Sequence, residues 1–270
     1  MHDVLIALQT DLASSIAIRY VCLIENFLRF NIQVVHIPTF DENGHSPGSG
    51  WVHQTWKNAI IEYAEKGISR LVQKENFYRY SMGKPKIIPG QRNQVILKEL
   101  QYQNYDFLIE GFLHSFEPDR FFKKLDSDLY RNLPCPVLMV QNLVKLDRGI
   151  QIVGTPDTIL SVLPWFFKFW DDLPVKADIL VCHFDTSNKE IITIPYNDNN
   201  LICRIKESVS NHEKRFDTIR SAKGSSNKLA SLIRDHALVI SLLSETSSPM
   251  AHMLAMSPCP ILLCPEPKTN

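Results

Sequence analysis

The chain contains the same run of residues twice, roughly half a chain length apart. Asn132-Leu-Pro-Cys-Pro-Val-Leu-Met-Val-Gln141 is matched by Met256-Ser-Pro-Cys-Pro-Ile-Leu-Leu-Cys-Pro265. In both copies a Pro-Cys-Pro turn is followed by a short apolar run, a pattern typical of a buried parallel strand that follows a helix. The residues before them repeat in the same order, since 105–111 matches 236–242 and 90–100 matches 224–233. The sequence therefore predicts two diverged copies of one βα unit, in domains 1–145 and 146–270.

Both copies alternate apolar runs with stretches of helical periodicity. In the first copy this pattern predicts strands over 4–8, 33–37, 77–81, 107–109 and 136–140, and helices near 14–30, 51–74 and 92–102. Ser14 or Ser15 is expected to cap the first helix, whose apolar face runs from Ile16 to Phe30. In the second copy it predicts strands over 150–153, 177–183, 216–221, 238–243 and 261–264, helices over 158–170, 227–234 and 250–256, and a β excursion over 190–195. Such alternation predicts an α/β fold with parallel sheets and right-handed crossovers.

Composition excludes several classes of partner. Lys plus Arg equals Asp plus Glu at 29 each, so no net field attracts nucleic acid or an anionic membrane. No apolar run approaches the roughly 20 residues of a transmembrane helix, and the amino terminus lacks the pattern of a signal peptide. The six cysteines show no CxxC spacing, which favours buried thiols in a reducing compartment. We therefore expect a cytoplasmic protein with no nucleic-acid partner and no membrane insertion.

The repeat resembles the universal stress protein family in its tandem form, in which two domains are fused. The resemblance rests on Asp106-Phe-Leu-Ile followed by Gly111, and on the Pro-Cys-Pro strands. It implies two five-stranded parallel sheets, each with strand order 3-2-1-4-5 and flanking helices. Because the family dimerises along its last strand, it also implies that the two domains pair within the chain as a pseudo-dimer. A homo-oligomer and a further protein partner stay open.

Family members with an intact glycine motif bind ATP or related nucleotides, and this chain departs from that motif in its first copy. The backbone of a glycine-rich loop and the start of the next helix supply N–H groups to phosphates. Gly111 holds the first glycine position, but Leu113 or His114 stands at the second. Lys123 and Lys124 stand where Gly-Ser is expected. The resemblance thus implies a degraded nucleotide site in this copy.

The second copy departs further. Its loop is largely deleted, and Ser247 and Ser248 align with the Gly-Ser pair. The family's acidic residue after the first strand is displaced in both copies, to Asp11 and Asp157. We therefore expect a non-catalytic binding or scaffold protein of the stress response that needs no cofactor. An ATP- or AMP-binding sensor acting through the first domain is the alternative within the family.

Any specific small ligand is expected at the carboxyl edge of the first sheet. Strands one and four diverge there and leave a crevice in doubly wound folds. Gly111 is either a retained phosphate-loop glycine or a tight-turn residue, and Gly111→Val is expected to remove binding with little change in melting temperature. The candidate ligand-binding residues are Gln9, Thr10, Asp11, His36, Ile37, Gly111, His114 and Ser115.

The sequence contains no recognisable catalytic motif. It lacks the Gly-x-Ser-x-Gly elbow and the Walker A lysine motif, so we expect no enzyme. A small hydrolase or transferase that uses the edge near His114 stays open as an alternative. Asp41, Glu42, His45 and His53 are interpreted as a solvated loop, and no metal site is expected. The aromatic run 165–170 is interpreted as core packing between the domains, with an apolar ligand cavity or an interface as the alternatives.

Overall fold

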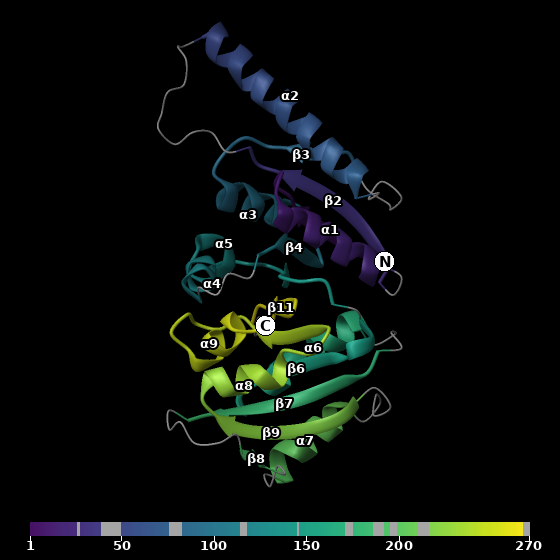
Figure 1. Ribbon diagram of the computed structural model, residues 1–270, viewed down its shortest axis with the longest axis vertical. Coiled ribbons are helices and arrows are strands. Elements are labelled where there is room, and N and C mark those ends of the chain that lie inside the picture. Colours follow the sequence, from purple (N-terminus) through teal and green to yellow (C-terminus); the bar gives the residue numbers. More distant parts are fainter. Residues whose placement is uncertain are drawn as a thin grey trace. The chain divides into compact units, whose positions relative to one another are not determined.

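The computed structural model describes residues 1–25, 28–38, 50–75, 83–113, 118–144, 146–170, 175–185, 192–194, 199–209 and 216–266 (Figure 1). The chain packs into two compact units, and each is described by itself. The first unit comprises Met1–Leu113 and Ser127–Val137, and the second comprises His114–Asp126 and Leu138–Asn270. The predicted domain boundary at 145/146 separates the two copies of the repeated sequence, whereas these two units are defined by packing. The boundary therefore stays a prediction.

The first unit contains a parallel sheet with strand order β3-β2-β1-β4. Its strands are β1 (His2–Ala7), β2 (Phe30–His36), β3 (Lys86–Ile87) and β4 (Phe107–Gly111). Leu108 N donates to Pro136 O at 2.9 Å, so the chain enters its fifth strand beside β4. The predicted order 3-2-1-4-5 is confirmed for this copy. The central strand β1 is buried over its last four residues, as expected for a strand covered on both faces.

The helices of the first unit are α1 (Leu12–Ile24), α2 (Trp51–Lys74), α3 (Arg92–Tyr102) and α5 (Asp128–Arg131). The predicted cap of α1 was wrong, because Asp11 and not a serine caps this helix. The apolar face predicted for this helix extended to Phe30, but Phe30 belongs to β2. The bounds of α2 and α3 agree with the predicted ranges, whereas the sequence analysis did not find α5.

The long helix α2 packs on its unit mainly through its carboxyl-terminal half. Among its described side chains, Ala64 is the first buried one, and Ile68 and Val72 follow on the same face. Figure 1 shows the amino-terminal half of α2 extending past the strands of this unit. The predicted strand over 77–81 falls outside the described residues, and the strand beside β2 is Lys86–Ile87.

The second unit contains the order β5-β11-β10-β6-β7-β9-β8. Its strands are β5 (Val137–Val140, within this unit from Leu138), β6 (Ile150–Gly154), β7 (Ala177–Phe184), β8 (Ile192–Ile194), β9 (Phe216–Gly224), β10 (Leu238–Leu242) and β11 (Ile261–Cys264). The second copy therefore also follows the predicted order 3-2-1-4-5, in strands β9-β7-β6-β10-β11. The β excursion is present as β8, which pairs antiparallel with β9 and adds a strand to the five expected. Gln141 Nε2 donates to Cys259 O at 3.2 Å, beside the neighbouring strands β5 and β11.

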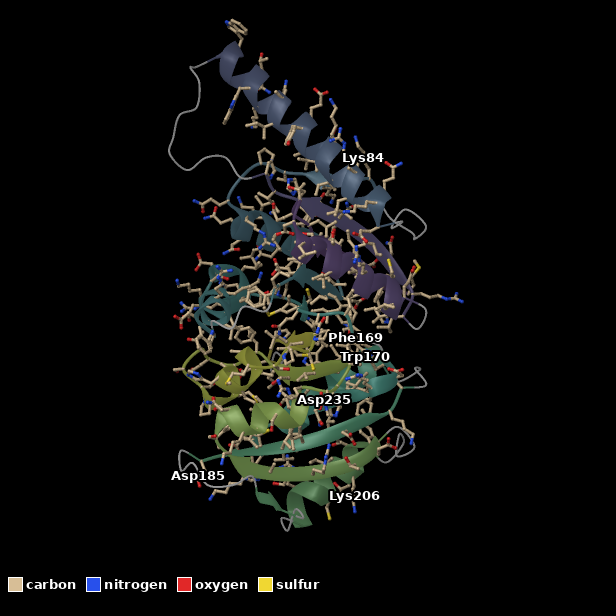
Figure 2. The ribbon with its side chains drawn as sticks, viewed as in Figure 1. Lys84, Phe169, Trp170, Asp185, Lys206 and Asp235 are labelled. Carbon is tan, nitrogen blue, oxygen red and sulfur yellow. The ribbon has the colours of Figure 1, made fainter. Side chains whose placement is uncertain are left out.

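The helical segments of the second unit are α4 (Pro118–Leu125), η2 (Leu146–Arg148), α6 (Ile159–Trp170), α7 (Asn199–Val209), α8 (Ser226–Ile233) and α9 (Pro249–Ala255). The sequence analysis did not find α4 or α7. Phe169 and Trp170 of α6, labelled in Figure 2, are buried. Phe166 is also buried, and its ring centroid lies 5.3 Å from that of Phe216. The aromatic run thus packs inside the second unit.

All six cysteines are thiols. Cys135, Cys182, Cys259 and Cys264 are buried, while Cys203 is exposed. In the part of the chain that the structure describes, no helix is both long and apolar enough to cross a bilayer.

Candidate functional site

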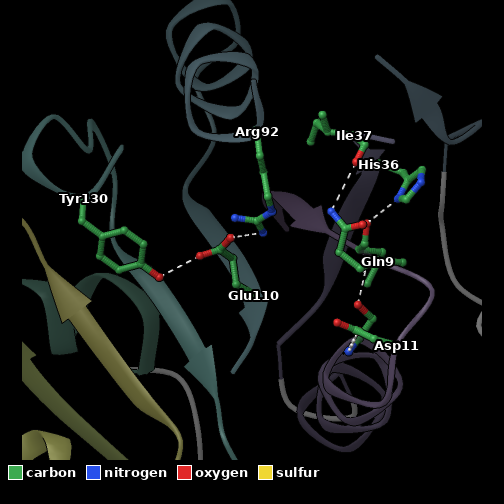
Figure 3. Close-up of polar contacts among 9 residues, drawn as sticks. Gln9, Asp11, His36, Ile37, Arg92, Glu110 and Tyr130 are labelled. Atoms are coloured by element: carbon green, nitrogen blue, oxygen red, sulfur yellow. Dashed lines mark hydrogen bonds and ion pairs between the residues drawn. The ribbon is translucent and has the colours of Figure 1, made fainter. Parts of the chain in front are cut away.

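The carboxyl edge of the first unit brings together segments that are distant in the sequence. Because β1, β2 and β4 are parallel, the residues that follow them emerge at one edge of the sheet. Gln9 comes just after β1, Ile37 directly follows β2, and Gly111 ends β4. Figure 3 shows the polar contacts at this edge, with α3 contributing its first residue, Arg92.

Two side chains connect the ends of β1 and β2. His36 Nδ1 lies 2.8 Å from Leu8 O, and Gln9 Nε2 donates to Ile37 O at 3.4 Å (Figure 3). A carbonyl oxygen only accepts, so Nδ1 of His36 carries the hydrogen. Burial lowers the pKa of His36, the hydrogen bond to Leu8 opposes this effect, and the charge of Arg92 adds to it. His36 is therefore a neutral donor engaged within the chain.

Asp11 serves the local structure of α1. Its Oδ1 accepts from Ser14 N at 2.9 Å, and Ser14 Oγ accepts from Gln9 N at 2.7 Å. This is an N-cap arrangement in which side chains satisfy backbone donors at the start of the helix. Thr10 is exposed and its methyl group lies against α2, because a Cβ added at Gly67 would lie 3.0 Å from Thr10 Cγ2. Asp11 Oδ1 and Ser14 Oγ are therefore both engaged in capping the start of α1.

Gly111 is explained by a close approach of two backbones. A Cβ at this position would lie 2.0 Å from Ala13 O and 3.0 Å from Ser14 N, in the first turn of α1. Among the glycines of the described residues, positive φ angles occur at Gly50, Gly90 and Gly149 and not here. The structure thus adds a third explanation to the phosphate loop and the tight turn. His114 and Ser115, the remaining candidates, lie outside the described residues.

A buried cluster of Arg92, Glu110 and Tyr130 lies at the same edge, and the sequence analysis missed it. Glu110, in β4, is 0% exposed. Its Oε1 forms an ion pair with Arg92 Nη2, and its Oε2 accepts from Tyr130 OH at 2.7 Å (Figure 3). Tyr130, from α5, is also 0% exposed, whereas the Arg92 side chain is 30% exposed. Each carboxylate oxygen of Glu110 therefore has its own donor.

The charges of this cluster hold one another in place. Burial is the largest effect on Arg92 and lowers its pKa, but attraction to Glu110, the hydrogen bond to Glu110 and smaller effects of Tyr130 and Asp11 together raise the pKa of Arg92. Burial, and then the nearby Glu110 carboxylate, raise the pKa of Tyr130 well above its ordinary value. Tyr130 is thus a neutral phenol that donates, and Arg92 is a cation. A buried carboxylate with two such donors is a satisfied ion-pair network.

One signal for this cluster was present in the sequence. Glu110 directly follows three apolar residues in a strand that was expected to be central, and a buried charge requires partners. The partners themselves were hidden, because Arg92 and Tyr130 lie 18 and 20 residues away on two different helices. Only the packing of α3 and α5 against the end of β4 brings them together.

The residues of both copies that align with the family's motif positions can also be placed in the structure. Ser248 Oγ accepts from Ala251 N at 3.1 Å and caps α9, while Ser247 is exposed. Lys123 and Lys124 lie in the last turn of α4, so they are not at the start of a helix. Asp157 lies in the exposed turn before α6.

A metal site would need several ligand side chains close together among the described residues. Among them, no group of three or more His, Cys, Asp and Glu side chains lies close enough to hold a metal ion. The loop candidates Asp41, Glu42 and His45 fall outside the described residues, and the side chain of His53 is not described. The Ser14 hydroxyl accepts from the backbone N–H of Gln9 at 2.7 Å.

Comparison with known proteins supports the fold. No protein-family model matches the sequence, and no curated protein matches it significantly. A universal stress protein from Archaeoglobus fulgidus superposes with a TM-score of 0.66 at 15% identity, covering 97% of this chain and 98% of that one. A putative universal stress protein from Pseudomonas aeruginosa gives 0.59 at 12% identity, covering 98% and 94%. A functionally unknown protein from Pseudomonas aeruginosa gives 0.60 at 13% identity, covering 98% and 93%. The fold of this chain is therefore that of a tandem universal stress protein.

Proposed function

We propose that this chain is a cytoplasmic member of the universal stress protein family that acts as a non-catalytic binding or scaffold protein in a stress response. One observation carries the proposal: the carboxyl edge of its first unit is occupied by the chain's own side chains. Gln9 and His36 bond to the strand ends, and Arg92 is paired with Glu110. The stress-response role is proposed from the family resemblance and the fold. The side chains that already bond to one another at this edge argue against an ordinary nucleotide site.

A nucleotide phosphate at this edge would have to break existing interactions. It needs N–H donors and positive charge, but Ser14 N is bonded to Asp11 and Arg92 to Glu110. Drawing Arg92 onto a phosphate would leave the fully buried Glu110 with a carboxylate that lacks its cation, which is strongly unfavourable. Glu110 would also repel the phosphate itself. Binding would therefore cost more here than at an open glycine loop.

The proposal excludes catalysis as the main role. Enzymes that use a nucleophile hold it within hydrogen-bonding distance of a base. At this edge the Tyr130 hydroxyl donates to a carboxylate whose other oxygen is neutralised by Arg92. Such an arrangement stabilises the fold, and within this described cluster both the hydroxyl and the carboxylate are already engaged with each other or with Arg92. A protein of this kind acts through a partner that recognises its surface, as a single chain or as a homo-oligomer.

Isothermal titration calorimetry with ATP and AMP on the full chain tests the nucleotide part of the proposal. We expect no affinity tighter than about 1 mM, the level of a weak nonspecific contact. Glu110→Gln removes the buried negative charge and releases Arg92, so this variant should gain measurable affinity for both nucleotides. Glu75→Gln is the matched control, because it releases the exposed Arg19 in the same way and should gain none.

Two results would contradict this reasoning. Micromolar binding of ATP by the unmodified chain would show that the edge is open to phosphate. Micromolar binding that is lost in Ser248→Lys would place a nucleotide in the second copy, despite the capping role of Ser248. A turnover screen that detects hydrolysis of ATP or of simple esters would argue against the non-catalytic role.

A further inference from the structure

A polar pocket of about 370 Å³ lies at the opposite, amino-terminal edge of the first unit. It is formed by the start of β1, the start of β2 and the connection between α3 and β4. The volume is that of a small-molecule site, for which about 300–1,000 Å³ is usual. The proposed function uses none of its residues. The polar and aromatic side chains that line it are Asp3, Asn31, Gln33, Gln103, Asn104 and Tyr105.

One wall of the pocket is a single face of the sheet. Asp3 of β1 is paired with Asn31 of β2, and Gln33 lies two residues further along β2. Because side chains alternate along a strand, these three point to the same side. Asp3 and Asn31 are exposed and Gln33 is partly exposed, so this wall is accessible to a small molecule.

The hydrogen bonds within the chain determine what this wall offers to a ligand. Asn31 Nδ2 donates to Asp3 Oδ1 at 2.8 Å, which leaves the amide oxygen of Asn31 for a ligand. Gln33 Nε2 donates to Val34 O and to Lys84 O at 2.9 and 3.0 Å. Gln33 Oε1 is directed toward Gly83, where an added Cβ would lie 3.1 Å from it. The wall therefore presents acceptors: the Asp3 carboxylate and two amide oxygens.

The other wall contains Gln103, Asn104 and Tyr105. The Tyr105 hydroxyl lies 2.7 Å from Gln103 Oε1 and 3.0 Å from Glu99 Oε1, and these two acceptors share its single hydrogen. Tyr105 is thereby fixed, and it contributes an aromatic ring to the lining. Asn104 is exposed and has no hydrogen bond to another described residue, so its amide is available at the rim.

The charge of the pocket is negative. Asp3 is the charged residue of the lining, and no described cation forms an ion pair with it. Lys86, a nearby cation, is paired with Glu99, and the imidazole Nδ1 of His2 lies 3.6 Å from Asp106. Lys84, labelled in Figure 2, is 86% exposed, and its Nζ lies 3.7 Å from Glu65. An anionic ligand is therefore disfavoured, and a cation is favoured.

We propose that this amino-edge pocket binds a small organic cation through a primary ammonium group. An ammonium carries three donors and no acceptor, which matches a wall of one carboxylate and two amide oxygens. The alkyl part of the ligand lies against the Tyr105 ring, and the pocket is much larger than an inorganic ion requires. This site is independent of the proposed lack of nucleotide binding at the other edge.

Calorimetry on the full chain at low ionic strength tests the proposal, with 1,4-diaminobutane as the probe. We expect a dissociation constant below about 1 mM and no binding of 1,4-butanediol, which has the same length but no charge. Asp3→Asn keeps the acceptor for Asn31 and should weaken binding at least about tenfold, because hydrogen bonds to a charged group are lost. Asp157→Asn removes the same charge from an exposed turn of the second unit and should leave the affinity unchanged.

A variant with increased affinity keeps the test independent of folding. Asn104→Asp adds a carboxylate at the rim without breaking a hydrogen bond to a described residue, and it should bind the diamine several-fold more tightly than the unmodified chain. The proposal is overturned if the diol binds as well as the diamine, or if Asp3→Asn and Asp157→Asn have equal effects. It is also overturned if magnesium chloride at equal concentration displaces the diamine, since the site would then be one for inorganic cations. Absence of any binding would show that the depression is only a surface feature.

Discussion

Removing the positive charge from the buried cluster of Arg92, Glu110 and Tyr130 should destabilise the first unit severely. Arg92→Met keeps most of the aliphatic volume but leaves Glu110, which is 0% exposed, without its cation. Breaking a buried ion pair by deleting one partner costs about 3–5 kcal/mol. The Arg92 side chain is 30% exposed, so water reaches part of the vacated space, and Tyr130 still donates at 2.7 Å. We therefore expect a loss of about 2–4 kcal/mol.

The matched comparison removes the whole cluster at once. In Arg92→Met/Glu110→Met/Tyr130→Phe, no buried charge or unpaired hydroxyl remains, and apolar groups fill a similar volume. Replacing a buried ionic network in this way is often neutral or stabilising, so the triple variant should lie within about 1 kcal/mol of the unmodified chain. Lys66→Met is the surface control, because Lys66 and its partner Glu62 are 63% and 66% exposed. Its expected loss is below about 1 kcal/mol.

Native-state hydrogen exchange followed by mass spectrometry is the suitable assay. A chain with two units need not unfold in a single two-state transition, so a global unfolding curve would be ambiguous. Hydrogen exchange avoids this problem because it gives the opening free energy of individual peptides, such as those from β1 and β4. Two outcomes would refute the reasoning: a loss below about 1 kcal/mol in Arg92→Met, or a triple variant as unstable as the single one. Either outcome would mean that Glu110 does not depend on Arg92 for its burial.

Two further predictions concern residues at the same edge. Gly111→Ala should lower the melting temperature strongly, because the added Cβ would lie 2.0 Å from Ala13 O. Gly224→Ala is the control and should be tolerated, because the atom nearest to its added Cβ is 3.8 Å away. Equal losses of melting temperature in scanning calorimetry would contradict the close-approach explanation of Gly111. His36 has a pKa below 6.5 in the folded chain, so the unfolded chain binds its proton first and stability should fall as the pH drops below about 6.5 toward the folded pKa. His36→Asn removes the titrating group but keeps an amide that can donate to Leu8 O. Between about pH 7.5 and about pH 5.5, the urea midpoint of this variant should change less than that of the unmodified chain. An equal change in both proteins would show that other groups cause the pH dependence.

The repeat and the apolar runs determined the class of fold. Two Pro-Cys-Pro strands with matched residues before them predicted two copies of one unit, and both copies show the order 3-2-1-4-5. The helices α2 and α3 were also predictable, because periodic apolar residues and flanking turn residues mark their ends. The start of α1 was mispredicted, since Asp11 and Ser14 are both good capping residues and only the local backbone shows which one caps. The short helices α4 and α5 lack a long periodic pattern and were missed. Helix α7 was missed as well, although it is as long as α3.

Only the tertiary structure decided which side chains contact one another at the carboxyl edge. The sequence could place Gln9, His36 and Gly111 at that edge, because parallel strands end together there. It could not show that Gly111 touches the backbone of α1, or that Arg92 and Tyr130 meet at Glu110. The physical reason is the separation of the interacting residues along the sequence. Helical periodicity and capping depend on residues only a few positions apart, so they can be recognised in the sequence. Partners of a buried charge are fixed only when helices and strands from distant parts of the sequence pack together.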